Sequence, residues 1–239
     1  MDMYEVFAQN PLLAILRNVP KEITLNYAGA ILRGGVKVFE VALNSPDALE
    51  QITLLHKTYG SKCLVGAGTA ISVECAQTAL DAGAQFLLTP GTPPDVLAFC
   101  RDRDVMLLPG VLTPTDVAVS LQYGFQTMKL FPAGDMPRSY VKDLKGPYND
   151  THYIAIGGVT PDNIQEFRRA GCLGVGLASS LMPKDKVAAR DWDAVRRMCT
   201  PLPPKQRADP EIIACIFCRL RVRELKAQIQ KHRPKPGGF

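Results

Sequence analysis

The sequence is poor in histidine and lacks the short motifs of several large enzyme classes. Its three histidines, His56, His152 and His232, lie far apart without the spacing of metal ligands. No Walker loop, nucleophile elbow or zinc signature is present. These absences argue against a zinc enzyme, a P-loop nucleotide hydrolase and a serine hydrolase.

Long hydrophobic runs are missing as well. No apolar segment approaches the roughly 20 residues of a membrane span. The first ten residues, "MDMYEVFAQN", lack the basic and apolar regions of a secretory signal. The seven cysteines are odd in number and scattered, a pattern typical of packed thiols in a reducing compartment. We therefore expect a cytoplasmic protein without membrane contact.

The net charge of +5 comes from the C-terminal part of the chain. Residues 201–239 hold nine Lys/Arg against three Asp/Glu, whereas residues 1–200 hold 19 against 20. The main body therefore has a formal charge of −1 and offers no broad basic surface for a polyanion. No nucleic-acid partner is expected.

The chain does have a regular alternation from Leu12 to about Thr200. A short apolar run is followed by a turn and then by an amphipathic stretch of roughly ten residues. Eight apolar runs are predicted as strands, at 12–17, 36–43, 63–68, 86–89, 105–110, 127–132, 153–158 and 174–179.

Helices fit between these runs. Ser45-Pro46 and Thr160-Pro161 each place a cap residue before a proline at a predicted helix start. The predicted helix ends carry glycine, at Gly34, Gly60, Gly83 and Gly171.

Eight βα units predict an α/β fold, a (β/α)₈ TIM barrel. The alternative is a doubly wound open sheet, which normally uses fewer strands. That fold also carries a glycine-rich dinucleotide turn after its first strand, and "LRNVPKE" is not one. The barrel is assigned to residues 1–200.

Residues 201–239 have a different character. "PLPPKQRADP" is typical of a linker, and the segment after it has helical composition with an Asp-Pro-Glu start signal. Cys215 and Cys218 have no second Cys/His pair at zinc spacing, so we interpret them as packing residues of that helix. We expect a basic, helical C-terminal appendage.

Few polar side chains interrupt the predicted strands. Arg17, Glu40 and Lys129 do so, and Thr69 follows the third strand closely. Catalytic residues of such barrels lie at the C-terminal ends of the strands and in the following loops.

Glu40 and Lys129 allow two interpretations. Strand alternation places Val38, Glu40 and Ala42 on one face, so an inward Glu40 would be buried with Lys129 about four strands away. The structural interpretation is a buried ion pair. The catalytic one is a proton-transfer group beside an amine nucleophile, because a desolvated lysine with a lowered pKa suits Schiff-base chemistry.

Two segments near the end of the predicted barrel favour a phosphate ligand. Gly157-Gly158 follows the seventh strand, and Ser179-Ser180 follows the eighth and opens a short helix. Backbone amides at such positions bind phosphate in many barrels. A tight Gly-Gly turn without a ligand is the alternative.

The motifs around these residues resemble a known family. The strongest are "GVKVFEVAL" around Glu40 and "GFQTMKLFPA" around Lys129, and "VGAGT", "TPG", "LLPGVLTPT" and "GGVTPDN" are also similar. The chain resembles the class I aldolases of 2-dehydro-3-deoxy-6-phospho sugar acids, the KDPG and KDPGal aldolases. The likeness covers about Pro11 to Thr200.

The resemblance implies a lyase that uses no metal and no cofactor, acts on a small phosphorylated sugar acid and forms a homotrimer. It implies that Lys129 forms the Schiff base and that Glu40 moves protons. It also implies substrate-binding roles for Arg17, Thr69, Gly157, Gly158 and Ser179.

Two positions are closer to the phosphogalactonate branch of this family. The phosphogluconate enzymes typically read "TLR" after the glutamate, whereas this chain reads "ALN" with Asn44. They typically carry Thr before the glycine pair, where this chain has Ile156. In that branch Arg17 would hold the substrate carboxylate. Because the two substrates differ only at C4, dual activity is an open alternative.

Two different functions are also compatible with a barrel of this kind. One is an aldolase for another 2-oxo acid, against which the Gly-Gly and Ser179 features argue. The second is a non-catalytic phosphate-binding barrel, which predicts loss of Lys129 or Glu40, and both are present.

Removal of residues 202–239 should leave kcat within a few-fold of the full chain, because the eight βα units precede this segment. The apolar residues of its predicted helix should pack on the barrel or on a neighbouring subunit, so solubility or assembly should suffer instead. A basic helix that binds a membrane or an acidic partner is the competing interpretation. Loss of turnover in a truncated protein that stays folded and assembled would contradict this prediction.

Overall fold

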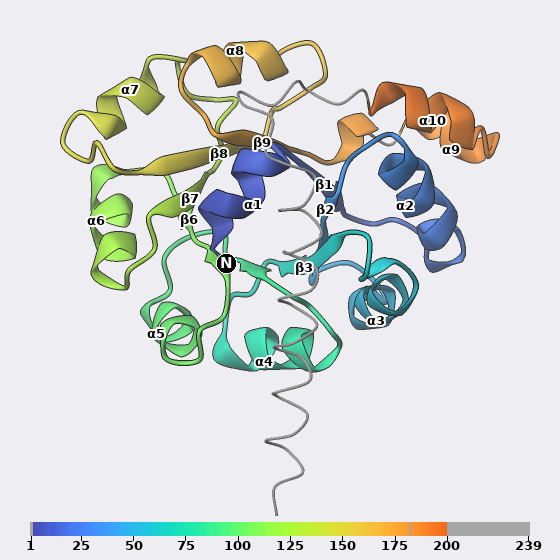
Figure 1. Cartoon of the computed structure of the whole chain (residues 1–239), viewed down its shortest axis with the longest axis horizontal. Helices are drawn as coiled ribbons and strands as arrows, with labels where there is room; N and C mark the ends of the chain where they lie inside the picture. Colours follow the sequence, from blue (N-terminus) through green and yellow to red (C-terminus); the bar gives the residue numbers. More distant parts are fainter. Residues whose placement is uncertain (1, 182, 200–239) are drawn as a thin grey trace, which may run out of the picture.

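The computed structural model describes residues 2–181 and 183–199, which form a barrel of parallel strands ringed by helices (Figure 1). The sheet order is β5-β4-β3-β2-β1-β9-β8-β7-β6. The strands are β1 Leu12–Leu16, β2 Val38–Ala42, β3 Leu64–Gly68, β4 Leu87–Leu88, β5 Leu107–Leu108, β6 Gly110–Val111, β7 Thr127–Leu130, β8 His152–Ile156 and β9 Gly174–Leu177. The predicted (β/α)₈ barrel is confirmed.

The predicted strand at 105–110 is two short strands, β5 and β6, on either side of Pro109. Proline lacks an N–H, so the ladder is interrupted there. The carbonyl oxygen of Leu108 accepts from the Thr89 amide at 3.4 Å, and that of Pro109 accepts from the Lys129 amide at 2.8 Å. The segment thus bonds to both edges of the sheet and closes the barrel.

Helices connect successive strands and cover the outside of the barrel (Figure 1). They are α2 Thr24–Arg33, α3 Ala48–Tyr59, α4 Val73–Asp81, α5 Pro94–Asp102, α6 Pro114–Gln122, α7 Tyr140–Lys145 and α8 Ile164–Arg169. A short 3₁₀ helix, η1 Lys21–Ile23, precedes α2, and η2 Ser179–Leu181, α9 Lys184–Ala188 and α10 Trp192–Met198 follow β9. The predicted glycine ends are confirmed: Gly34 and Gly60 are C-caps, and Gly83 and Gly171 follow helices with φ of +103° and +107°.

The two predicted cap-proline starts are wrong by two or three residues. Helix α3 begins at Ala48, because the Ser45 hydroxyl accepts a hydrogen bond from the Asn18 amide and caps no helix. Helix α8 begins at Ile164, because the Thr160 amide donates to the Asn163 side chain within a turn. In both places the proline belongs to a turn that precedes the helix.

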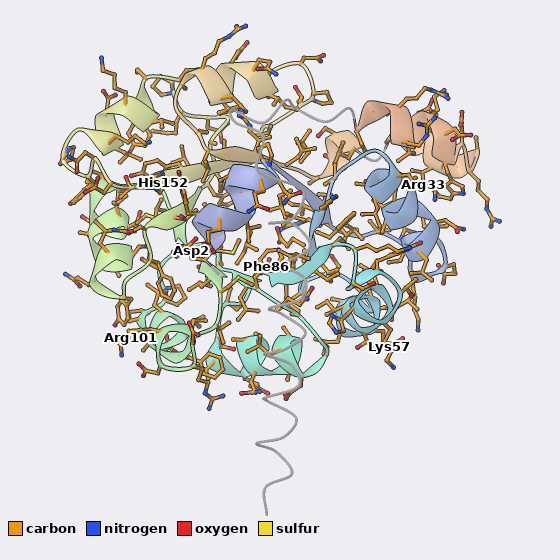
Figure 2. All side chains as sticks on the ribbon, in the orientation of Figure 1. Asp2, Arg33, Lys57, Phe86, Arg101 and His152 are labelled. Carbon is orange, nitrogen blue, oxygen red and sulfur yellow. The ribbon has the colours of Figure 1, made fainter. Side chains whose placement is uncertain are left out.

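A further helix, α1 Met3–Gln9, precedes the first strand and was not predicted. Asp2 and Glu5 form a capping box at its start. Its buried side chains Met3, Val6 and Phe7 join the apolar cluster inside the barrel. Figure 2 shows the labelled Asp2 and Phe86 close to the centre of the view, where α1 covers the N-terminal mouth.

The core has two parts, divided by strand alternation. Val38 of β2 belongs to the cluster inside the barrel, whereas Phe39 and Val41 belong to the larger cluster between strands and helices. The predicted inward face of this strand, which carries Glu40, is therefore correct. With α1 closing one end, the interior opens at the C-terminal ends of the strands.

Within residues 2–181 and 183–199, no helix has the length and apolarity needed to cross a membrane. The proposed appendage at 201–239, with Cys215 and Cys218, lies outside the described residues, and its separation from the barrel stays a prediction.

Candidate active site

A pocket of about 330 Å³ lies at the C-terminal end of the barrel. Its walls come from β1, β2, β7, β8, β9 and the loops that follow them. The lining residues include six of the seven predicted site residues: Arg17, Glu40, Lys129, Gly157, Gly158 and Ser179. Another pocket, of about 200 Å³, lies by α1 at the opposite end and contains none of them.

Glu40 and Lys129 are nearly fully buried inside this pocket. Their exposed fractions are 1% and 5%. Glu40 lies on β2 and Lys129 on β7, four strand steps apart around the sheet, as the sequence predicted. The barrel therefore brings two opposite charges, 89 positions apart in the sequence, to one cavity.

Burial moves both groups toward their neutral forms. Desolvation lowers the pKa of Lys129, which the carboxylate of Glu40 partly counteracts and the Arg17 guanidinium reinforces. Desolvation raises the pKa of Glu40, which the positive charges of Lys129 and Arg17 partly counteract. No described residue donates a hydrogen bond to Oε2 of Glu40. The site thus holds an amine that loses its proton easily and a carboxyl group with one oxygen that can still accept a hydrogen bond.

Gly68, the last residue of β3, makes room for the Glu40 carboxyl group. A Cβ atom at this position would lie 1.5 Å from Oε1 of Glu40. The strands are in register, with Glu40 opposite Gly66 and Ala42 opposite Gly68. A missing side chain on one strand therefore determines where the carboxylate of the next strand lies.

Arg17 and Thr69 occupy different places. Arg17 follows β1 directly, is exposed and lines the pocket. Thr69 follows β3 with a left-handed φ of 64° and is half-buried, but it is not among the residues that line the pocket. Asn44 is exposed and also stays outside the lining, whereas Ile156 is part of it.

The glycine pair forms one rim of the pocket. Gly157 and Gly158 have φ of +87° and +70°, which glycine adopts without steric cost. The loop after β7 lies against them, since the Gly134 amide donates to the Gly157 carbonyl at 2.8 Å. A Cβ on Gly134 would lie 2.7 Å from Cα of Gly158. Ser179 begins the 3₁₀ helix η2 on the adjacent part of the rim.

Sequence reasoning gave no role to Gly68, Phe131 or Asn163. The Phe131 ring lines the pocket with its centroid 4.6 Å from Nζ of Lys129. All three lie inside the quoted motifs, but the pattern of residues alone does not reveal which neighbours they contact. No group of three or more His, Cys, Asp or Glu that could bind a metal ion occurs within the described part of the chain.

Comparison with known proteins decides the family. Residues 3–198 match the family described as "Aldolase: KDPG and KHG aldolase". The chain belongs to this family. It is 35% identical over 172 residues to the 2-dehydro-3-deoxy-6-phosphogalactonate aldolase of Escherichia coli K12. This match covers 72% of this chain and 84% of that enzyme.

Two solved structures are similar to this aldolase. One is a KDPG aldolase from Legionella pneumophila with pyruvate captured as a covalent carbinolamine. It is 27% identical with a TM-score of 0.77, and the match covers 84% of this chain and 97% of the Legionella chain. A native KDPGal structure is 32% identical with a TM-score of 0.73. The match covers 80% of this chain and 92% of that structure's chain. The resemblance drawn from the six motifs is confirmed.

Replacing Gly68 by Ala should displace the Glu40 carboxyl group and lower kcat for pyruvate release by about 10²-fold, the lower end of a general acid–base contribution. Gly91→Ala is the matched control, because a Cβ there would meet no atom within 4 Å. Circular dichroism should show both variants folded. An unchanged kcat in Gly68→Ala would mean that the reaction tolerates another position of Glu40.

Proposed function

We propose that this aldolase cleaves 2-dehydro-3-deoxy-6-phosphogalactonate to pyruvate and D-glyceraldehyde 3-phosphate through a Schiff base on Lys129. The observation that carries the proposal is the buried Lys129 with a lowered pKa, in one pocket with a buried carboxyl group. A neutral amine is the nucleophile that imine formation requires.

The reaction begins when the Lys129 amine attacks the C2 ketone of the sugar acid. The resulting carbinolamine loses water and becomes a protonated imine, which is an electron sink. Glu40, directly or through a water, takes the proton of the C4 hydroxyl, and the C3–C4 bond breaks as its electrons move into the imine. Glyceraldehyde 3-phosphate leaves, and an enamine of pyruvate remains on Lys129.

The second half of the reaction restores the enzyme. Glu40 returns a proton to C3 of the enamine, and a water molecule hydrolyses the imine to pyruvate and the free amine. The raised pKa of Glu40 suits both steps, because a general acid–base group works best when its pKa approaches the working pH. The Phe131 ring lies beside Nζ of Lys129, with its centroid 4.6 Å away.

The two ends of the substrate have different partners in this proposal. The guanidinium of Arg17 at the pocket wall holds the carboxylate. Thr69, which follows β3 and lies outside the pocket lining, is a further contact that the family resemblance implies. The backbone of Gly157 and Gly158 and the hydroxyl of Ser179 hold the phosphate at the opposite rim. Positive charge at one end and backbone donors at the other suit an acid that carries a carboxylate and a phosphate.

The preference for the galactonate epimer rests on the E. coli relative, which carries that name, and on Ile156, an apolar side chain on the pocket wall. The phosphogluconate epimer is the second candidate, since a 2-dehydro-3-deoxy-phosphogluconate aldolase from Treponema pallidum is 32% identical over 173 residues. One or two side chains at C4 could set the choice.

We also propose a homotrimer in the cytoplasm, as the family resemblance implies. Ultracentrifugation or light scattering of the full chain measures the assembly.

Borohydride treatment with pyruvate should inactivate the enzyme and attach a three-carbon adduct to the peptide that contains Lys129. Reduction converts the imine into a stable amine, so mass spectrometry identifies the lysine. Lys129→Met should lose both the adduct and turnover. An adduct on another lysine, or full activity of Lys129→Met, would overturn the assignment of the nucleophile.

Pyruvate release from the two C4 epimers of the phosphorylated acid tests the substrate assignment. We expect the higher kcat/KM on the phosphogalactonate epimer. Ile156→Thr should move the ratio toward the phosphogluconate epimer, and Ile71→Thr, whose side chain is exposed and outside the pocket, is the control. A higher kcat/KM of the unchanged enzyme on the phosphogluconate epimer would refute the epimer preference but not the reaction.

A further inference from the structure

One side chain outside the pocket holds the turn that carries the glycine rim. Oδ1 of Asn163 accepts a hydrogen bond from the Thr160 amide at 2.9 Å, and its Nδ2 donates to the Gly158 carbonyl at 2.9 Å. The Asn163 amide also donates to the Thr160 carbonyl at 3.2 Å. Both ends of one half-buried carboxamide are therefore used within a single turn.

These bonds determine where the neighbouring amides point. In a planar trans peptide the carbonyl and the next N–H point in opposite directions. Because the Gly158 carbonyl points at Asn163, the N–H of Val159 points away from it. On the other side, Oγ of Ser180 donates to the Val159 carbonyl at 3.2 Å and fixes the next peptide. Gly158, Val159 and Ser180 line the pocket, whereas Asn163 does not.

A Gly-Gly turn has a particular need for such a restraint. Glycine has more backbone freedom than any other residue, so ordering Gly157 and Gly158 around an anion has a large entropic cost. A turn already held in the binding conformation avoids that cost when the ligand arrives. The rim of this pocket is held by Asn163 on the α8 side and by Ser180 on the η2 side.

We propose that Asn163 is a positioning residue for the phosphate of the substrate, acting through the backbone of Gly158, Val159 and Thr160. This inference rests on the proposed function, in which the glycine rim binds the phosphate. Asparagine suits the position because the turn offers one donor, the Thr160 amide, and one acceptor, the Gly158 carbonyl. Aspartate would satisfy only the Thr160 amide and would add negative charge beside the anion site.

The test compares substrate and pyruvate in the same variants. Asn163→Ala should raise KM for the phosphorylated acid about tenfold, as expected for one or two lost hydrogen bonds, with a much smaller change in kcat. Asn163→Asp keeps the bond to Thr160 and should raise KM further. The inhibition constant of inorganic phosphate should rise in parallel. The rate of borohydride trapping with pyruvate, which has no phosphate, should stay within about twofold in both variants.

Asp191→Ala is the matched control. Asp191 is a half-buried residue at the start of α10, whose Oδ1 accepts from the Ala194 amide at 2.9 Å, and it lies outside the pocket. Its loss should lower the melting temperature without changing KM or phosphate inhibition. A matching loss of pyruvate trapping in both Asn163 variants would indicate a general structural role and overturn the proposal, as would an unchanged KM in Asn163→Asp.

The unchanged enzyme separates this inference from the proposed function. If it traps pyruvate and cleaves the phosphorylated acid, the function stands and the Asn163 variants decide the positioning role. If it forms no pyruvate adduct, the proposed function fails in the unchanged protein. If it cleaves phosphorylated and unphosphorylated acids with equal kcat/KM, the phosphate role of the rim fails, and the Asn163 proposal fails with it.

Discussion

The site depends on the removal of Lys129 and Glu40 from water. Burying a single charged group costs free energy, so burial shifts both Lys129 and Glu40 toward their neutral forms. When both are charged, their attraction reduces the cost of burying them. The barrel imposes this condition because both side chains project from apolar strands into an interior filled by Ile15, Val38 and Ile154. The proposed chemistry depends on that environment, since the same lysine on the surface would be a protonated, unreactive ammonium.

The rest of the barrel serves to keep the two groups in place. Pro109 interrupts the fifth strand but leaves carbonyl oxygens for both neighbours, so the ring closes at β7, the strand that carries Lys129. At the opposite end α1 fills the N-terminal mouth with apolar side chains. Closure on that side leaves the C-terminal ends of the strands as the entrance to the pocket.

Three glycines help to shape the site. The absent side chain of Gly68 gives space to the Glu40 carboxyl group, and that of Gly176 gives space to Ile156 and Ile15 on the pocket wall. At the rim, Gly134 allows the loop after β7 to lie directly on Gly158. A methyl group on any of these glycines would force a neighbouring group to move.

The barrel, the inward face of β2 and the burial of Glu40 and Lys129 could be predicted from the sequence, because alternation and apolar runs are local properties of the chain. The sequence did not reveal the split of the fifth strand at Pro109, the helix α1 that covers the barrel, or the true starts of α3 and α8. Those depend on which distant group takes a hydrogen bond, as Asn18 does with Ser45. Tertiary structure alone decided that Gly68 accommodates Glu40, that Asn163 holds the glycine rim and that Thr69 stays off the pocket lining, because each relation joins atoms that only the closed barrel brings together.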